Sequence, residues 1–197
     1  MPHHITQRET RRFDVFRDEA GRLDYLTLFR NCREFFLRII FLIAAPYRAC
    51  IRSRIRAHCL MTNQAHYIAI PERPDLTRKV FHCVHGTHSR RFNIMYGFVG
   101  HLWQERPFSC VLDEPHVWSA IRYVERNPVR AAMVMKAADY RWSSAAAHCS
   151  GEADSVFDVS ARPSTVGTDW TVCLDGEDDP HAHQFIRDRT AVGRPCG

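Results

Sequence analysis

The sequence predicts a mixed α/β (α+β) domain over residues 1–150 and a polar C-terminal extension over residues 151–197. Segments in which every second residue is apolar alternate with longer segments in which apolar residues recur every three or four positions, as strands and helices require. After residue 150, Gly, Asp, Ser, Pro and Thr dominate, which is typical of a tail. We expect at most one short helix there, near residues 181–189.

The composition indicates a globular protein that can contact phosphate groups. The chain has 197 residues, 45% of them apolar, with 27 Lys plus Arg against 22 Asp plus Glu and a net charge of +5. Arg greatly outnumbers Lys, and the guanidinium group matches phosphate oxygens. The 8 cysteines include no pair spaced as in a zinc knuckle or a thioredoxin motif.

The N-terminus has no apolar leader, so we expect a cytosolic protein with reduced thiols. The one membrane candidate, residues 35–45, contains Arg38 and is shorter than the roughly 20 apolar residues that cross a bilayer. We expect this run to form the end of a buried helix that stops at Pro46, with a membrane-peripheral role as the weaker alternative.

The first part of the chain predicts a strand, a helix and a hairpin. Residues 3–8 alternate in polarity, and a helix should then begin at Asp18. Residues 51–59 should form the next strand, with its apolar residues on one face, and residues 64–70 should pair with it as a hairpin. The apolar face of residues 51–59 is expected to hold Ile51, Ile55, Ala57 and Cys59. The opposite face should carry a basic row of Arg52, Arg54, Arg56 and His58.

The second part predicts a helix, a strand and a further helix. The segment from Asp75 to Gly97 fits one long helix or a kinked pair around Gly86. Residues 108–112 should form a strand, and Asp113 should cap a helix with a proline in its first turn. This order of elements is ferredoxin-like: an antiparallel sheet with helices on one face, here with an added helix.

Two small groups of residues are candidates for chemistry. Tyr123 and Asn127 lie one helical turn apart, with Pro128 expected to place Asn127 at the helix end with its side chain reaching outwards. Gln64 and His66 share one strand face, where an amide oxygen and an imidazole nitrogen can converge on a divalent ion. In isolation, each pair is more simply explained by packing, capping or solvation.

Six blocks of sequence change that assessment by their order and spacing: HHITQR (3–8), CLMTNQAH (59–66), RRFN (90–93), GHLWQ (100–104), RYVERNPVRAAMV (122–134) and WSSAAAH (142–148). In this ordered set the chain resembles the REP-associated tyrosine transposases, which belong to the single-tyrosine, His-hydrophobic-His transposases of bacteria. The resemblance covers most of residues 1–150, and the ordered set is specific although no single block is.

The resemblance implies a cytoplasmic bacterial protein that binds single-stranded or hairpin DNA, such as REP-like palindromes, and cleaves and rejoins it. In the family, a helix tyrosine attacks the phosphate to leave a 5′-phosphotyrosine, while two strand histidines and a polar helix residue hold Mg²⁺ or Mn²⁺. By this resemblance Tyr123 is the nucleophile, His66 the second strand ligand and Asn127 the helix position that assists the metal. Gln64 stands where the family has its first histidine.

Other departures from the family leave two interpretations open. Glu9 and Thr10 replace a usual Gly-Asn, residues 105–107 replace a usual Gly-Arg-Phe, and residues 35–56 look partly inserted. The chain is then either a weak transposase or nicking enzyme, or a catalytically inactive remnant that still binds hairpin DNA. Whether it is a monomer or a dimer stays open.

Basic and aromatic side chains are the expected DNA contacts. The arginines in question are Arg8, Arg52, Arg54, Arg56, Arg90, Arg91 and Arg106. The aromatic residues that could stack bases are Tyr67, Trp103 and Trp118. We expect a solvated or DNA-facing surface at His82, His85 and His88. The pair His181 and His183 spells the two-histidine motif, but it lies in the tail and is interpreted as a coincidence.

Overall fold

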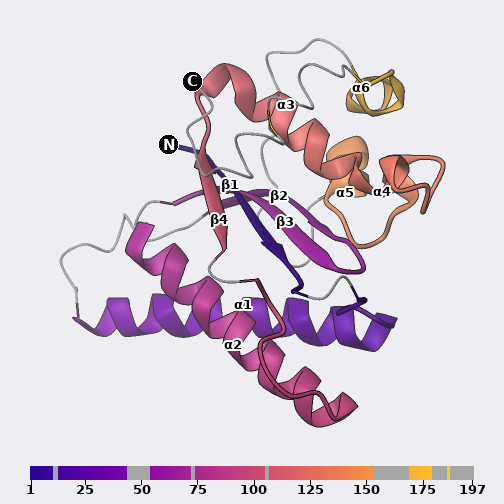
Figure 1. Cartoon of the computed structure of the whole chain (residues 1–197). Helices are drawn as coiled ribbons and strands as arrows, with labels where there is room; N and C mark the ends of the chain where they lie inside the picture. Colours follow the sequence, from indigo (N-terminus) through magenta and orange to yellow (C-terminus); the bar gives the residue numbers. More distant parts are fainter. Residues whose placement is uncertain are drawn as a thin grey trace.

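The computed structural model shows a four-stranded sheet with helices on both faces (Figure 1). It describes residues 1–10, 13–43, 54–71, 74–104, 107–152, 169–178 and 186, with the backbone alone at 36–43, 54, 74 and 76. The expected tail helix near residues 181–189 therefore lies outside the described residues, apart from residue 186. No helix in the described ranges is long and apolar enough to cross a membrane.

The sheet has the strand order β2-β3-β1-β4, with every neighbouring pair antiparallel. Its strands are β1 (His3–Arg8), β2 (Arg54–Leu60), β3 (Gln64–Ile70) and β4 (Phe108–Val111). This order and the alternation with two helices confirm the predicted ferredoxin-like architecture. The expectation of helices on one face is wrong, because helices cover both faces of the sheet. The bounds of β1 and β3 agree with the sequence prediction, and β4 ends one residue early.

The two long helices α1 (Glu19–Ile43) and α2 (Pro74–Tyr96) lie on one face of the sheet, below it in Figure 1. The Asp18 carboxylate accepts a hydrogen bond from the Gly21 N–H at 2.7 Å, which starts α1 as expected. Helix α2 is continuous through Gly86, so the single long helix is the correct alternative. It ends at Tyr96, and the next residue, Gly97, has a φ of 66°, the left-handed geometry that commonly follows a helix C-terminus.

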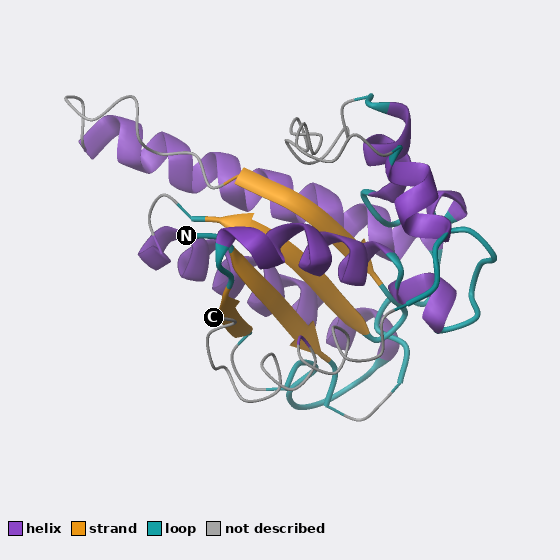
Figure 2. Cartoon of the chain, turned by 90° about the horizontal axis from the view of Figure 1, so that it is seen from above, coloured by secondary structure: helices purple, strands orange, loops and turns teal. Residues whose placement is uncertain are grey.

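Helix α3 (Glu114–Glu125) covers the opposite face and runs across the strands when the sheet is seen from above (Figure 2). Asp113 caps it, as the sequence predicts, and Ala120, Ile121 and Val124 form its buried stripe. Shorter helices continue this layer: α4 (Asn127–Arg130), η2 (Ala137–Asp139), α5 (Ala145–Ser150) and α6 (Trp170–Asp175). The sheet is thus buried on both faces. One apolar cluster lies between the sheet and the pair α1 and α2, and a second lies between the sheet and α3.

A β-bulge corrects the face predicted for β2. Ile55 pairs with Ala69 and Ala57 with Ile68, so the ladder shifts by one residue at Arg56. Ile55 consequently packs in the cluster beneath α1 and α2, whereas Ala57 packs in the cluster beneath α3. The expected single apolar face is wrong, because a bulge places two residues of one strand opposite one residue of its partner. His58, expected on the solvent face, is buried.

Several side chains expected at the surface belong to the interior instead. Tyr67, His85 and Trp103 are buried, and so is His88, while His82 alone of the three α2 histidines is exposed. The Tyr67 hydroxyl donates to the Tyr25 hydroxyl, and that oxygen lies 2.9 Å from His85 Nε2. Burial lowers the pKa of His85 to about 3, so its imidazole is neutral. These residues connect α1, α2 and the sheet, and their buried rings are not available to stack on a nucleobase.

Candidate functional site

Tyr123 lies against two imidazole rings on the α3 face of the sheet. Its ring centroid is 6.4 Å from that of His66 on β3 and 5.9 Å from that of His4 on β1, both in edge-to-face geometry. The two imidazoles stack at 5.6 Å, with His66 Nδ1 3.4 Å from His4 Nε2. His66 and Tyr123, which the resemblance assigns to one site, therefore lie side by side. His4 on β1, which contacts both rings, was not predicted.

The position of His4 follows from strand pairing. His4 lies opposite Ile68, and His66 lies opposite Thr6, so the two histidines are diagonal neighbours on one face of the β1–β3 ladder. The alternation of β1 places His4 on one face of the strand, but this becomes informative only once the register between β1 and β3 is known.

Both imidazoles are neutral at ordinary pH. Burial lowers the pKa of His4 to about 4. The pKa of His66 lies well below its usual value, first because of burial and then because of the nearby His4, Arg130 and Arg8. His66 Nε2 is buried and has no hydrogen-bond partner among the described residues. The site thus holds a neutral imidazole with one unpartnered nitrogen, which accepts a proton or binds a ligand in the tautomer that carries the hydrogen on Nδ1.

Two arginines hold the amide side chains at this site. Arg8 donates to Gln64 Oε1 from Nε and Nη2, at 3.3 and 3.2 Å. Arg130 Nη2 donates to Asn127 Oδ1 at 2.7 Å, and the Arg130 guanidinium carbon lies 4.3 Å from the centre of the Tyr123 ring. Asn127 is 8% exposed, so the expectation that it reaches outwards is wrong. Helix α3 does end before it, but the next turn, α4, folds its side chain inwards.

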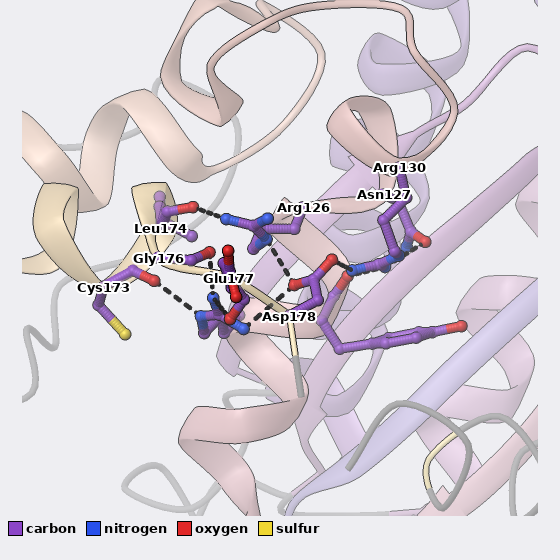
Figure 3. Close-up of polar contacts among 10 residues, drawn as sticks. Arg126, Asn127, Arg130, Cys173, Leu174, Gly176, Glu177 and Asp178 are labelled. Carbon is purple, nitrogen blue, oxygen red and sulfur yellow. Dashed lines mark hydrogen bonds and ion pairs between the residues drawn. The ribbon is translucent and has the colours of Figure 1, made fainter. Parts of the chain in front are cut away.

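Three arginines beside Tyr123 converge on one carboxylate from the chain after residue 150 (Figure 3). Asp178 lies 2.6 Å from Arg126 Nε, 3.2 Å from Arg122 Nη1 and 3.7 Å from Arg130 Nη1. Figure 3 shows Asp178 between Arg126 and Arg130. Arg122 also donates to the backbone oxygens of Cys173, Gly176 and Glu177, and Arg126 to that of Leu174. Neither Asp178 nor this cluster was predicted from the sequence.

A buried carboxylate anchors the helix that carries Tyr123. Glu125 is completely buried and accepts hydrogen bonds from Ser144 Oγ, His148 and Trp170 Nε1. The donors belong to α5, to the Ser144 that precedes it and to α6, so the carboxylate of α3 joins these segments. Because an unpaired buried carboxylate is costly, this network fixes the end of α3 and the orientation of the site.

The arrangement fits a divalent cation poorly. The nearby donors are two imidazoles and two amide oxygens, from His4, His66, Gln64 and Asn127. Both amide oxygens already accept hydrogen bonds from guanidinium groups, and the charges of Arg8 and Arg130 oppose an added cation. In the part of the chain that the structure describes, no three His, Cys, Asp or Glu side chains cluster as a metal site.

The arginines expected at DNA are distributed over both faces. Arg8 lies beside the site, whereas Arg90 and Arg91 are exposed on α2, beneath the other face, where Arg91 forms an ion pair with Asp24. Arg56 occupies the bulge and is half-buried. Arg52 and Arg106 lie outside the described residues, as does the side chain of Arg54. Trp118, the third expected stacking residue, packs edge-to-face on Trp170.

One solved structure relates this fold to a known protein. The chain is similar to the REP-associated tyrosine transposase in its complex with a REP hairpin, with a TM-score of 0.50 and 14% sequence identity. The match covers 90% of this chain and 92% of that chain. At this identity the likeness shows a distant fold relationship. No family model matches the sequence, and no curated protein matches it.

Proposed function

We propose that this chain is a transposase-like protein that binds single-stranded or hairpin DNA and cleaves one strand through Tyr123. The observation that supports the proposal is the packing of Tyr123 against two neutral imidazoles and one guanidinium group. A nucleophile, a proton acceptor and a phosphate-binding cation are the three groups that phosphodiester transfer requires. The fold shared with a hairpin-bound transposase is consistent with the same class of ligand.

The chemistry follows from the roles of these groups. The Tyr123 oxygen forms a bond to phosphorus, and the bond from phosphorus to the 3′ oxygen breaks, which leaves a 5′-phosphotyrosine and a 3′-hydroxyl. A phenol with a pKa of about 10 is a poor nucleophile unless its proton is accepted. His4 or His66 accepts that proton and returns it to the leaving 3′ oxygen. Arg130 stabilises the negative charge that develops on the phosphate.

A second candidate function is a binding remnant without catalysis. The observation that favours it is the engagement of Gln64 by Arg8 and of Asn127 by Arg130, which leaves no amide oxygen free for Mg²⁺ or Mn²⁺. Such a protein would retain the arginines that contact phosphate and lack the cation that the resemblance implies. The two candidates share their DNA ligand and differ only in the covalent step.

The test is a search for a covalent adduct. Labelled hairpin DNA with single-stranded flanks is incubated with the protein in EDTA, Mg²⁺ or Mn²⁺ and separated on denaturing gels. The variant Tyr123→Phe keeps the ring that packs on His4 and Arg130 and removes only the hydroxyl. We expect an adduct with the unmodified protein and none with Tyr123→Phe.

Other results of the same assay decide between the candidates. The remnant is supported if the unmodified protein binds the hairpin without forming an adduct and an adduct appears only in Gln64→His. An adduct that persists in Tyr123→Phe overturns the assignment of the nucleophile. A failure of the unmodified protein to bind any hairpin or single strand overturns both candidate functions.

A further inference from the structure

Two cysteine thiols face each other between α1 and α2. Cys32 Sγ on α1 lies 2.8 Å from Cys83 Sγ on α2, although the two residues are 51 positions apart in the sequence. Even two carbon atoms in contact are separated by roughly 3.5 Å or more, and sulfur is larger than carbon. An S–S bond measures about 2.05 Å. The two sulfur atoms therefore lie closer than ordinary non-bonded contact and need to approach by only about 0.8 Å to form a bond.

Neighbouring contacts hold the two helices at this separation. The ring of Phe29 on α1 packs edge-to-face on Phe81 of α2, with the ring centroids 5.3 Å apart. One turn earlier on α1, the Tyr25 hydroxyl lies 2.9 Å from His85 Nε2 of α2. Cys32 follows Phe29 by three residues and so lies on the same face of α1. The two thiols are therefore brought together by the packing of whole helices, which lie side by side on one face of the sheet (Figure 1).

The two thiols differ in their access to solvent. Cys32 is 7% exposed and belongs to the apolar cluster between the helices and the sheet. Cys83 is half-buried and lines a hollow of about 640 Å³ beside α2, together with Arg78, Lys79 and His82. Burial and the neighbouring Cys83 thiol raise the pKa of Cys32, so Cys32 remains protonated at neutral pH. A reagent in solution therefore reaches Cys83 first.

The geometry of the pair does not suit a metal ion. Two thiolates that share a tetrahedral zinc ion, with Zn–S bonds of about 2.3 Å, lie about 3.8 Å apart. The separation of Cys32 and Cys83 is about 1 Å shorter. A structural zinc site also needs four ligands, and within the described ranges no three His, Cys, Asp or Glu side chains cluster as a metal site. The pair is suited instead to a covalent bond between its two sulfur atoms.

We propose that Cys32 and Cys83 form a reversible disulfide bond on reaction with a small-molecule disulfide such as oxidised glutathione. Cys83 loses its proton to water, and its sulfur attacks one sulfur of the oxidant, which forms a mixed disulfide and releases one glutathione thiol. Cys32 then loses its proton and attacks the Cys83 sulfur, which releases the second glutathione thiol. Two protein thiols are thereby oxidised, and one small-molecule disulfide is reduced to two thiols. The proposal does not depend on the proposed function, because the pair lies on the face of the sheet opposite Tyr123.

The bond would stabilise the folded chain. It links α1 to α2 across β2 and β3, which lie between them in the sequence. A cross-link between residues so far apart removes conformational freedom from the unfolded chain. We therefore expect oxidation to raise the midpoint of thermal unfolding by about 8 °C. Where thiols are kept reduced the pair stays open, and it closes when small-molecule disulfides accumulate.

The test begins with the full chain, reduced with dithiothreitol and freed of it. The protein is treated with oxidised glutathione, its remaining thiols are blocked with N-ethylmaleimide, and it is digested with trypsin without reductant. We expect mass spectrometry to find a disulfide between the peptides of residues 31–33 and 80–90, each of which contains one cysteine. The thermal midpoint of the oxidised protein should rise by about 8 °C, and dithiothreitol should restore the original value.

Variants of each cysteine separate the two steps. Cys32→Ala removes the second attack, so Cys83 should retain one bound glutathione, without a rise in the thermal midpoint. Cys83→Ser removes the accessible thiol, so neither the linked peptides nor a glutathione adduct at Cys32 should appear. Cys149→Ser, at a half-buried cysteine of α5, is the matched control and should form the linked peptides as the unmodified protein does.

Three results would overturn the proposal. The first is a glutathione adduct that persists on Cys83 in the unmodified protein without the linked peptides. The second is a disulfide from Cys32 or Cys83 to another cysteine, such as Cys50. The third is a folded protein whose thiols do not react, with linked peptides only after unfolding in urea. None of these measurements uses DNA, so they decide the proposal whether or not the chain binds a hairpin.

Discussion

The guanidinium group of Arg130 lies over the ring of Tyr123 and donates a hydrogen bond to Asn127 Oδ1. One side chain thereby connects the candidate nucleophile, the end of its helix and the carboxylate of Asp178. Burial lowers the pKa of Arg130, with Tyr123 and Asp178 acting in the opposite direction. A guanidinium group remains charged under these conditions, so a cation lies directly beside the phenol.

Replacing Arg130 should therefore affect both binding and chemistry. We expect Arg130→Ala to weaken hairpin binding about tenfold and to slow formation of the Tyr123 adduct about 100-fold, because a phosphate-stabilising donor is lost. Arg130→Lys should retain part of the binding, since it keeps the charge without the planar fork. Anisotropy and single-turnover gels measure the two effects. An Arg130→Ala protein with an unchanged adduct rate would remove Arg130 from the mechanism.

The carboxylate of Asp178 should stabilise the folded chain. Its side chain is 20% exposed, and it faces three guanidinium groups that are exposed by 10 to 23%. We expect Asp178→Asn to lower the free energy of unfolding by about 2 kcal/mol, because three partly buried cations lose their counter-charge. Urea unfolding measures the change. The exposed neighbour Glu177→Gln alters the net charge equally and should have little effect. Equal destabilisation by both variants would contradict the role of the ion pairs.

Glu125 should be among the most sensitive positions in the protein. Its carboxylate accepts hydrogen bonds from three buried donors, whereas a Gln side chain would present an N–H₂ group to one of them. We expect Glu125→Gln to destabilise the protein by about 3 kcal/mol and to expose Trp170 to solvent. Denaturation and the tryptophan emission spectrum test this. Glu114→Gln, at an exposed position of the same helix, is the control. A native emission spectrum and stability in Glu125→Gln would show that the network is dispensable.

Acid should destabilise the fold through its buried histidines. Folding holds the pKa below the ordinary value for four of them, namely His4, His66, His85 and His88. Above pH 6.5 both the folded and unfolded chains carry these rings neutral. As the pH falls from about 6.5 towards 4, the unfolded chain binds protons that the folded chain cannot, so stability decreases by up to about 1.4 kcal/mol per pH unit for each ring.

Urea unfolding between pH 7.5 and 5 measures this dependence. His88 packs on Phe16, Tyr25 and Trp103, so His88→Phe should preserve packing and reduce the pH slope by about one quarter. His82→Phe, at an exposed position of α2, controls for the simple loss of a histidine. A stability that is constant between pH 7.5 and 5 would contradict the buried, neutral state of these rings.

The sequence was most informative where local chemistry decides the structure. The alternation of residues 3–8 and 64–70 gave the bounds of β1 and β3, and Asp113 gave the start of α3. The approach of His66 to Tyr123 followed from strand and helix periods once these two elements were assumed to pack together. The bounds of these elements need only neighbours within a few residues, whereas the packing of His66 on Tyr123 also needs the two elements to meet.

The remaining features depend on contacts between distant segments. His4 joins the site through the register of β1 against β3, and Asp178 reaches Arg126 across about 50 residues of sequence. Which histidines of α2 are buried depends on Tyr25 of α1, which lies 60 residues earlier than His85. None of these pairings has a periodic signal in its own segment.

The extra residue in β2 changes which face of the sheet the odd-numbered residues of that strand point to. Before Arg56, the odd-numbered Ile55 faces the layer of α1 and α2; after it, the even-numbered Leu60 does, while the odd-numbered Ala57 and Cys59 face α3. A deletion at this point would turn Ile55, which precedes it in β2, from the layer of α1 and α2 to the layer of α3. In a strand without the extra residue, the residues that face α1 and α2 alternate without interruption. The face that each residue occupies is therefore a better guide than residue identity when this strand is aligned with others.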